Sequence, residues 1–157
     1  MEHCCCFTGH RLSRLAPYDR KKIQAALARE IAGLVAQGVT RFYTGMADGV
    51  DLLAADQVLC RYDAKLTAVV PYQNHISSVA ASCREDYARI LSAADETVVL
   101  MERYCPSVFF MRNDYMVAHC GHLIAVYDGF SRGGTLYTLN RAKDMGRHII
   151  LIDPVAL

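Results

Sequence analysis

Short apolar runs alternate with amphipathic stretches along the whole chain. The apolar runs are bounded by charged residues, Gly or Pro, and they predict strands at residues 3–7, 39–44, 65–70, 97–101, 122–127 and 148–152. Between them, apolar side chains recur at the spacing of one helix face, which predicts helices at residues 17–37, 51–61, 77–93, 106–120 and 135–145.

Most of the predicted strands are continuously apolar, as at residues 66–70 and 123–126. Strands that are buried on both faces under helices have this composition. The regular alternation of strand and helix implies right-handed crossovers and a mostly parallel sheet. We therefore predict the α/β class, with one Rossmann-like three-layer domain over residues 1–157 and a sheet of about six strands.

Composition and charge narrow the classes of partner. Hydrophobic residues make up 53% of the 157-residue chain and charged residues 21%, which is typical of a compact domain with buried strands. The net charge of +1 disfavours a nucleic-acid partner, and the basic cluster at residues 11–22 is typical of a solvated helix face. The apolar runs are too short to span a membrane, and the N-terminus lacks a signal-peptide pattern, so we expect a cytoplasmic location.

The seven cysteines include the consecutive Cys4, Cys5 and Cys6 but no CxxC pair. Neighbouring strand residues point to opposite faces, so these three thiols cannot share one metal site. We interpret the cysteines as small buried side chains in a reducing compartment, and we assign no metal.

Ligands of doubly wound sheets bind at the carboxyl ends of the strands. The candidate ligand-binding residues therefore follow the predicted strands or begin the neighbouring helices, and they are Thr8, Gly9, His10, Arg11, Thr44, Gly45, Asp48, Asp51, Pro71, Tyr72, Arg112, Asn113, Tyr127, Asp128, Gly133, Gly134 and Thr135.

Two glycine-containing turns in this set favour an anionic ligand. Residues 43–51 pass from a strand through a polar turn into a helix, and residues 133–135 open the helix at 135–145. Free backbone N–H groups and the positive end of a helix dipole suit a phosphate at such junctions. Neither turn fits the GxGxxG or P-loop pattern, which disfavours ordinary NAD binding and Walker-type ATP hydrolysis.

Several candidates carry two interpretations each. Asp48 is favoured as a helix N-cap over a ligand contact, and Asp51 either stabilises the first helical turn or binds ribose hydroxyls. Arg11 and Arg112 bind phosphate or form surface ion pairs. Asn113 is a candidate for a base or sugar contact.

Aromatic residues at two strand ends have a similar double interpretation. Tyr72 and Tyr127 either stack on a base or cap the core. His10 is the best candidate for a general acid because it is titratable and lies in a glycine-flanked loop, with Asp51 and Asp128 as further catalytic candidates.

The motifs CCFTGHR at residues 5–11, TGMADGVD at 44–51, RN at 112–113, YDG at 127–129 and GGT at 133–135 occur in this order. Together they resemble the YpsA-like branch of the SLOG superfamily, which also contains the DNA-processing protein DprA and the LOG phosphoribohydrolases. The resemblance implies a Rossmann-like fold and a pocket for a nucleotide or nucleotide-derived ligand, such as an ADP-ribose-like molecule. LOG enzymes carry PGGxGTxxE, whereas here Thr138 stands at the glutamate position and residues 130–132 replace the Pro-Gly-Gly.

The leading hypothesis is a module that binds or senses a small nucleotide-type ligand, because two anion-ready turns occur without a convincing catalytic set. The alternatives are a nucleotide-processing hydrolase or transferase, with LOG-type cleavage disfavoured by the missing glutamate, and DprA-like single-stranded DNA binding. The apolar segment 104–115 either covers the pocket or forms the face of a homo-oligomer.

Overall fold

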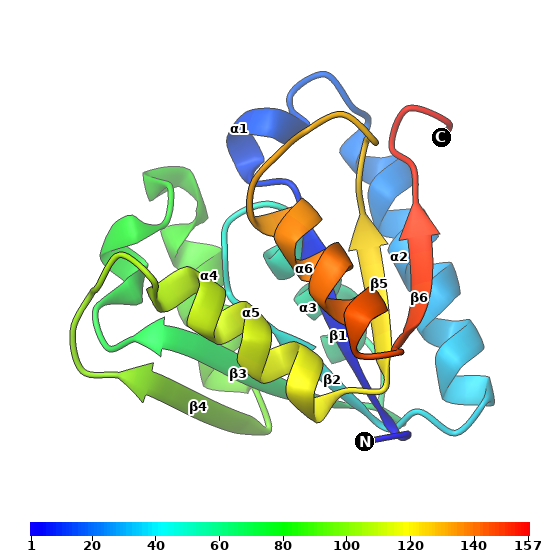
Figure 1. Ribbon diagram of the computed structural model, residues 1–157, viewed down its shortest axis with the longest axis horizontal. Coiled ribbons are helices and arrows are strands. Elements are labelled where there is room, and N and C mark those ends of the chain that lie inside the picture. Colours follow the sequence, from blue (N-terminus) through cyan, green and yellow to red (C-terminus); the bar gives the residue numbers. More distant parts are fainter.

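The computed structural model describes all residues 1–157, and its centre is a six-stranded sheet with every strand parallel (Figure 1). The strands are β1 (Cys4–Gly9), β2 (Arg41–Thr44), β3 (Lys65–Tyr72), β4 (Glu96–Met101), β5 (His122–Val126) and β6 (His148–Ile152). Their order across the sheet is β4-β3-β2-β1-β5-β6, so the chain winds outward from β1 in one direction and then from β5 in the other. This arrangement confirms the predicted Rossmann-like α/β fold.

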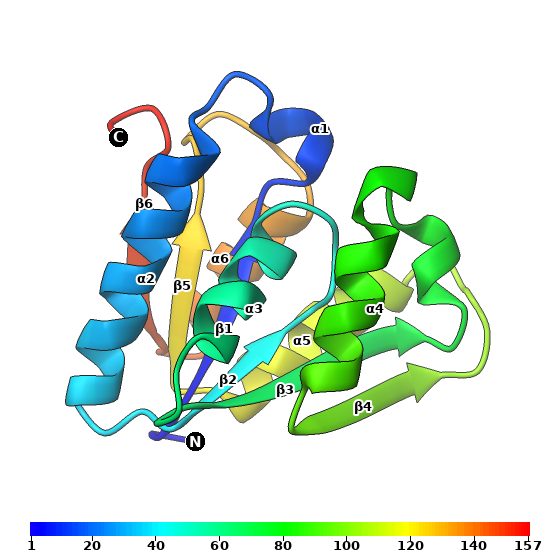
Figure 2. The ribbon, with the colours of Figure 1, turned by 180° about the vertical axis from the view of Figure 1, so that it is seen from behind.

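Helices cover both faces of the sheet. One face carries α2 (Arg20–Ala36), α3 (Val50–Leu59) and α4 (Arg84–Ala93), which stand in front in Figure 2. The other face carries α5 (Val108–His119) and α6 (Gly134–Asp144), which stand in front in Figure 1. The short helix α1 (Leu12–Leu15) follows β1 directly and was not predicted from the sequence. None of the helices combines the length and apolar character needed to cross a membrane.

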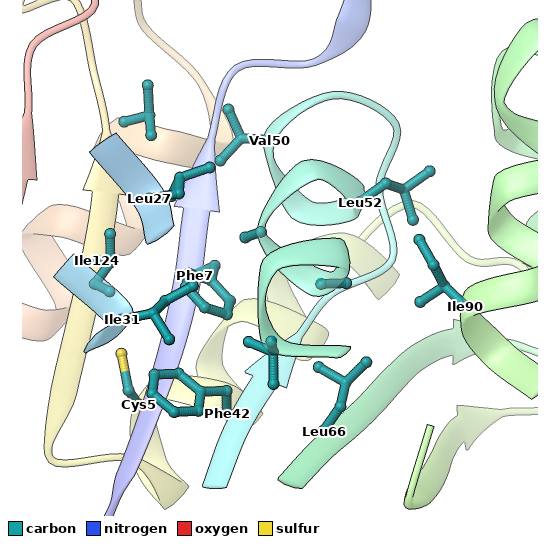
Figure 3. Close-up of a cluster of buried hydrophobic side chains, with 14 of the residues drawn as sticks. Cys5, Phe7, Leu27, Ile31, Phe42, Val50, Leu52, Leu66, Ile90 and Ile124 are labelled. Atoms are coloured by element: carbon teal, nitrogen blue, oxygen red, sulfur yellow. The ribbon is translucent and has the colours of Figure 1, made fainter. Parts of the chain in front are cut away.

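The larger hydrophobic cluster lies between the sheet and the three-helix face (Figure 3). Helix α2 contributes Ile23, Leu27, Ile31 and Leu34, which recur at the spacing of one helix face and are almost fully buried. They pack in one cluster with strand residues such as Phe7, whose ring stacks on that of Phe42 at 5.8 Å.

A second, smaller cluster lies under α5 and α6 and includes the buried thiols of Cys6 and Cys120. Cys5 instead belongs to the larger cluster on the opposite face. All seven cysteines are free, and Cys60 is exposed, so buried thiol packing explains some of these residues but not all.

Several predicted element boundaries differ from the observed ones by one to three residues, as at the start of α2 and the end of β1, and two differences have a clear structural cause. The helix expected from residue 77 begins only at Arg84, and two 3₁₀ turns, η1 (His75–Ser78) and η2 (Ala81–Cys83), precede it. Side-chain bonds hold the backbone out of the α-helix here: Ser77 Oγ donates to Asn74 O, and Ala80 N–H donates to a carboxylate from another loop.

Strand β3 continues through Pro71 to Tyr72 instead of ending before the proline. The neighbouring strand β2 ends where Thr44 pairs with Ala68, so Pro71 lies beyond the ladder on that side. A proline is tolerated at such a position because no partner strand needs its missing N–H.

Candidate functional site

A cavity of about 330 Å³ lies at the carboxyl ends of the strands, beside β1 and β5. This is the point at which the winding of the sheet reverses, where ligands of open α/β sheets bind. Four segments of the chain meet here, and the lining residues are Phe7, Thr8, Gly9, His10, Arg11, Ser13, Arg14, Ala47, Asp51, Phe109, Phe110, Arg112, Asn113, Ser131, Arg132, Gly134 and Thr135.

The structure brings together a large part of the site predicted from sequence. The predicted residues that line the cavity are Thr8, Gly9, His10, Arg11, Asp51, Arg112, Asn113, Gly134 and Thr135. They come from β1, α3, α5 and α6, so residues more than a hundred positions apart share one chamber because neighbouring strand ends meet at one edge.

Other predicted residues lie behind the cavity wall and shape it. Thr44 is fully buried, and its hydroxyl donates to Asp51 O at 3.0 Å and accepts from Met46 N–H. Gly45 lies against two cavity side chains: a Cβ placed on it would be 2.8 Å from Asp51 Oδ2 and 2.9 Å from Arg112 Nε. Gly45 therefore makes room for these two groups.

Asp48 is not the N-cap of α3, because Gly49 occupies that position. The Asp48 carboxylate accepts from Leu12 N–H at 3.1 Å and from Ala80 N–H at 2.9 Å. It therefore joins the loops that follow β1, β2 and β3. The Asp48 carboxylate is thus bonded to two loops of the protein, and Asp48 is absent from the cavity lining.

The N-terminus of α3 is closed by the loop that follows β1. Val50 N–H donates to His10 O at 3.1 Å, and the missing Cβ of Gly49 lets its backbone press against that of His10, Arg11 and Leu12. A positive φ of 95° at Gly49 also favours glycine. The turn at residues 43–51, which the sequence indicated as an anion site, thus supplies Ala47 and Asp51 to the cavity. The N-terminus of the helix that follows it, α3, is occupied by the backbone of the loop after β1.

The N-terminus of α6, by contrast, opens on the cavity. Gly133 at its N-cap provides no side-chain cap, and Gly134 and Thr135 line the chamber. First-turn N–H groups of an uncapped helix need an acceptor, and an anion is a suitable one. Asn113 Nδ2 lies beside this end, 3.7 Å from where a Cβ of Gly134 would be.

Four arginines line the cavity, and none of them forms an ion pair with a carboxylate of the protein. Arg112 is only 5% exposed, and its Nη1 and Nε donate to two neutral acceptors, Gly45 O and Asn113 Oδ1, both at 3.1 Å. Burial lowers the pKa of Arg112 to about 10, with Asp51 opposing the shift, so the guanidinium stays charged at neutral pH. Asp51 lies nearby but beyond ion-pair distance, so the buried charge of Arg112 is only partly compensated, and an anion in the cavity would compensate it further.

The guanidinium groups of Arg11 and Arg112 both lie over the ring of Phe109, at 4.9 Å and 5.3 Å from its centroid. Arg11 has no hydrogen-bond partner in the protein and contributes a second positive charge beside Arg112. Cation–π contacts of this kind hold an arginine in place without using its donors. Those donors therefore remain available to a ligand.

Asp51 is the one carboxylate of the lining. Its Oδ2 accepts from Ala47 N–H at 3.2 Å, and its Oδ1 has no partner. Burial raises the pKa of Asp51, while Arg112, the Ala47 N–H and Arg11 oppose the rise. No basic side chain lies within ion-pair distance of Asp51, so no direct contact neutralises the charge of its carboxylate.

His10 is 3% exposed, and its Nε2 accepts from Asp128 N–H at 3.2 Å. The ring proton therefore lies on Nδ1, which has no acceptor in the protein. Burial lowers the pKa of His10, Asp128 opposes the shift, and Arg14 adds to it. A neutral imidazole with a free donor can hydrogen-bond a ligand, and it is a weak general acid at neutral pH.

Asp128 organises the loop before α6. Its carboxylate accepts from Phe130 N–H, Ser131 N–H and the Ser131 hydroxyl at 2.7–2.9 Å. Burial alone would raise the pKa of Asp128, but these hydrogen bonds outweigh it and hold the pKa at about 2. The ionised Asp128 carboxylate thus holds the loop through three hydrogen bonds, and it does not line the cavity.

Pro71, Tyr72, Tyr127 and Gly133 are also outside the lining. Tyr72 packs edge-on against Tyr104 at 5.7 Å and against Phe109 at 6.4 Å. Phe109 lies between the end of β3 and the cavity, which explains why the strand-end residues after β3 do not reach it. The Tyr127 hydroxyl donates to Ser131 O and supports the same loop as Asp128.

Sequence reasoning missed part of the lining, namely Phe7, Ser13, Arg14, Ala47, Phe109, Phe110, Ser131 and Arg132. Arg14 belongs to the basic cluster at residues 11–22, interpreted as a solvated face; its place one helical turn after Arg11 was the signal that could have found it. Phe109 and Phe110 belong to the segment 104–115 and line the cavity. No group of three or more His, Cys, Asp or Glu side chains is placed to hold a metal ion.

A family model described as the YspA SLOG family (YpsA) matches residues 5–155. The chain belongs to the YpsA family. The match spans every segment that lines the cavity, from Phe7 to Thr135. The predicted resemblance to the YpsA-like branch is thereby confirmed.

Curated relatives of this YpsA-family chain carry the name UPF0398 protein. One from Bacillus thuringiensis (strain Al Hakam) is 29% identical over 130 residues, which cover 79% of this chain and 71% of the relative. One from Halalkalibacterium halodurans is 28% identical over 147 residues, which cover 87% of this chain and 78% of the relative. These names state no ligand or activity, so the chemistry of the cavity has to be argued from its own residues.

Proposed function

We propose that this YpsA-family chain binds or senses a nucleotide or nucleotide-derived anion in the cavity beside β1 and β5. The observation that carries the proposal is Arg112, a buried guanidinium with two neutral acceptors and no carboxylate partner. Arg11, Arg14 and Arg132 add positive charge to the same lining, where Asp51 is the only carboxylate. A phosphate-bearing ligand supplies the missing counter-charge.

The uncapped N-terminus of α6 supports a position for the phosphate. Backbone N–H groups of its first turn, the Thr135 hydroxyl and Asn113 Nδ2 are donors gathered at one end of the cavity. Asn113 is oriented by its own network, because its Oδ1 accepts from Arg112 Nε and its Nδ2 is left to donate. Donors fixed in this way bind an anion with little reorganisation.

A thermal-shift screen of nucleoside mono- and diphosphates, ADP-ribose and nucleotide sugars tests this proposal. A ligand present at a hundred times its Kd stabilises the native state by about 2.7 kcal/mol. For a domain of this size that raises Tm by roughly 5–10 °C. We expect at least one compound of the panel to produce such a shift in the wild-type protein.

The variant Gly134→Val locates the binding site. Gly134 has a helical, unstrained backbone, and its nearest neighbour for a Cβ is Asn113 Nδ2 at 3.7 Å, so a larger side chain fills the cavity without a backbone clash. Gly33→Ala in α2 is the matched control, because nothing lies within 4 Å of its Cβ position and it is outside the cavity. The ligand-induced shift should vanish in Gly134→Val and persist in Gly33→Ala; a shift that persists in both variants contradicts this site.

A nucleotide-processing enzyme is the second candidate, favoured by Asp51 and His10. Both side chains are more than nine-tenths buried, line the cavity and have one polar atom without a protein partner. Once a ligand is identified, product formation is followed for the wild type and His10→Gln, in which the amide oxygen replaces Nε2 as acceptor of Asp128 N–H. Turnover that is lost while binding is retained supports an enzyme, and unchanged ligand after long incubation supports a sensor.

A further inference from the structure

We infer that Asp51 accepts a hydrogen bond from a hydroxyl group of the ligand, so that the cavity takes a phosphorylated sugar in preference to a bare anion. The inference rests on the proposed function and assigns one specificity-determining contact within it. Asp51 is the only carboxylate of the cavity lining, which contains four arginines.

The Asp51 carboxylate is held firmly and directed into the cavity. It is 6% exposed, lies in the first turn of α3, and has its Oδ2 fixed by Ala47 N–H. The only fully enclosed side-chain N or O atom without a hydrogen-bond partner in the protein is His122 Nδ1. Asp51 Oδ1 is therefore not sealed within the protein, and the cavity is the space that it faces.

The protein offers Oδ1 no donor of its own. Arg112 lies close to the carboxylate, since a Cβ on Gly45 would contact both side chains, yet its two hydrogen bonds go to Gly45 O and Asn113 Oδ1 and none of its nitrogens is within ion-pair distance of Asp51. A buried carboxylate oxygen without a donor is unfavourable. A ligand group that binds here must therefore donate a hydrogen bond.

The chemistry of the cavity selects a hydroxyl among possible donors. A phosphate oxygen is excluded from this position because it would repel the carboxylate, and a ligand ammonium group is disfavoured by the neighbouring charges of Arg11 and Arg112. A neutral hydroxyl has neither penalty. The imidazole of His10, with its free Nδ1–H, is a further neutral donor in the same lining.

The cavity lining thus has two kinds of polar group with different preferences. The donors at α6, namely backbone N–H groups, Thr135 and Asn113 Nδ2, suit the phosphate. The acceptor Asp51 suits a hydroxyl. A phosphate ester of a hydroxylated sugar has both groups in one small molecule, which is the ligand class that the geometry indicates.

Isothermal titration calorimetry with three probes tests the assignment: ribose 5-phosphate, n-butyl phosphate, which has the phosphate but no hydroxyl, and inorganic phosphate. A hydrogen bond to a charged group contributes about 1.5–3 kcal/mol, or roughly 10- to 100-fold in affinity. We expect the wild-type protein to prefer ribose 5-phosphate over n-butyl phosphate by at least about tenfold.

The variant Asp51→Asn should affect the affinity for ribose 5-phosphate differently from the affinity for inorganic phosphate. It keeps an oxygen for Ala47 N–H but removes the negative charge, so binding of ribose 5-phosphate weakens while binding of inorganic phosphate stays equal or strengthens. Asp63→Asn, an exposed carboxylate paired with Arg61, is the matched control and should leave all three affinities unchanged. Melting curves without ligand verify that both variants are folded.

The possible failures are distinguishable. Equal wild-type affinity for ribose 5-phosphate and n-butyl phosphate overturns the hydroxyl contact but leaves anion binding intact. An Asp51→Asn variant that binds all three probes more tightly by the same factor also overturns it, because Asp51 would then act by repulsion alone. Absence of binding by every probe in every folded variant rejects the phosphate site and this inference together.

Discussion

At the scale of single residues, the site depends on where a side chain is missing. Gly45 leaves the space in which the Asp51 carboxylate and the Arg112 side chain approach each other, although Gly45 itself does not line the cavity. Sequence patterns indicated that a glycine was needed after β2. They could not tell a glycine that touches ligand from one that makes room for two residues that do.

Replacing Gly45 with Ala should therefore destabilise the fold as well as disturb the site. The added Cβ would be 2.8 Å from Asp51 Oδ2 and 3.0 Å from the Arg112 side-chain Cδ, and both side chains are buried and held by hydrogen bonds. Overpacking of this kind costs about 1–3 kcal/mol. Urea unfolding should show that loss in Gly45→Ala and a much smaller change in Gly134→Ala; equal stabilities would mean that the Asp51 and Arg112 side chains can move apart freely.

At the scale of elements, three loops at one end of the sheet are joined by one carboxylate. Asp48 lies after β2 and accepts from Leu12 N–H after β1 and from Ala80 N–H after β3. The loop after β1 carries His10 and Arg11, so their positions in the cavity depend on this connection. The apparent helix N-cap of the sequence is in this way a tertiary contact, because a carboxylate at a strand end meets donors from neighbouring loops.

Substitution of Asp48 by Ala leaves the two N–H groups without acceptors. Both donors are only partly buried, so water can replace part of the lost bonding, and we expect the free energy of unfolding to fall by about 1–3 kcal/mol for the two hydrogen bonds together. Amide hydrogen exchange should accelerate at residues 10–14 and 79–81 while the protected core of β1 and β5 is unchanged. The exposed Asp63→Ala serves as control, and unchanged exchange in both loops would show that Asp48 does not hold them.

At the scale of the whole molecule, an aromatic cluster connects the cavity to the helical layer of α4. His75 is 2% exposed, its Nδ1 lies 3.1 Å from the Tyr87 hydroxyl, and its ring contacts those of Tyr72 and Phe109. Burial lowers the pKa of His75 to about 3, and the charges of Arg112 and Arg11 add to the shift. Folding therefore requires a neutral imidazole at this position.

The stability of the protein should consequently fall as pH decreases from 6.5 towards 3. The unfolded chain binds a proton at His75 in this range and the folded chain does not, so the free energy of unfolding decreases by about 1.4 kcal/mol per pH unit below the unfolded pKa. The His75→Phe variant lacks the titrating group, and between pH 6.5 and pH 5 it should lose about 1.5 kcal/mol less than the wild type. Chemical denaturation at both pH values measures the difference, and parallel pH profiles would show that His75 is not a source of acid sensitivity.

Much of the fold was predictable because its signals are local. The alternation of apolar strands with amphipathic helices specified all six strands, and α2 illustrates how a stripe such as Ile23, Leu27 and Ile31 predicts its own buried face. The failures occurred where tertiary contacts override local preference. Residues 77–83 lack a regular helix because Asp48 takes the Ala80 N–H, and β3 passes through Pro71 because its neighbour β2 is short.

The site was predictable in its location and less so in its composition. Thr8 to Arg11 and Gly134 to Thr135 were grouped from sequence because they follow predicted strands or begin a helix at the carboxyl edge, whereas the pairing of β1 with β5 came only from the structure. Phe109 and Phe110 could not be assigned to the cavity lining from sequence, because periodicity does not indicate which face of α5 lies against the cavity. Side-chain direction at a cavity built from four segments depends on packing between them.

The sequence by itself determined the α/β class and membership of the YpsA family, because these follow from periodicity and motifs along the chain. Only the tertiary structure decided which polar groups stay without partners. It closed the end of α3 with the backbone of His10, left α6 open, and buried Arg112 and Asp51 around Gly45 without an ion pair. Hydrogen bonding and desolvation depend on neighbours distant in sequence, and they decide which candidates can meet a ligand.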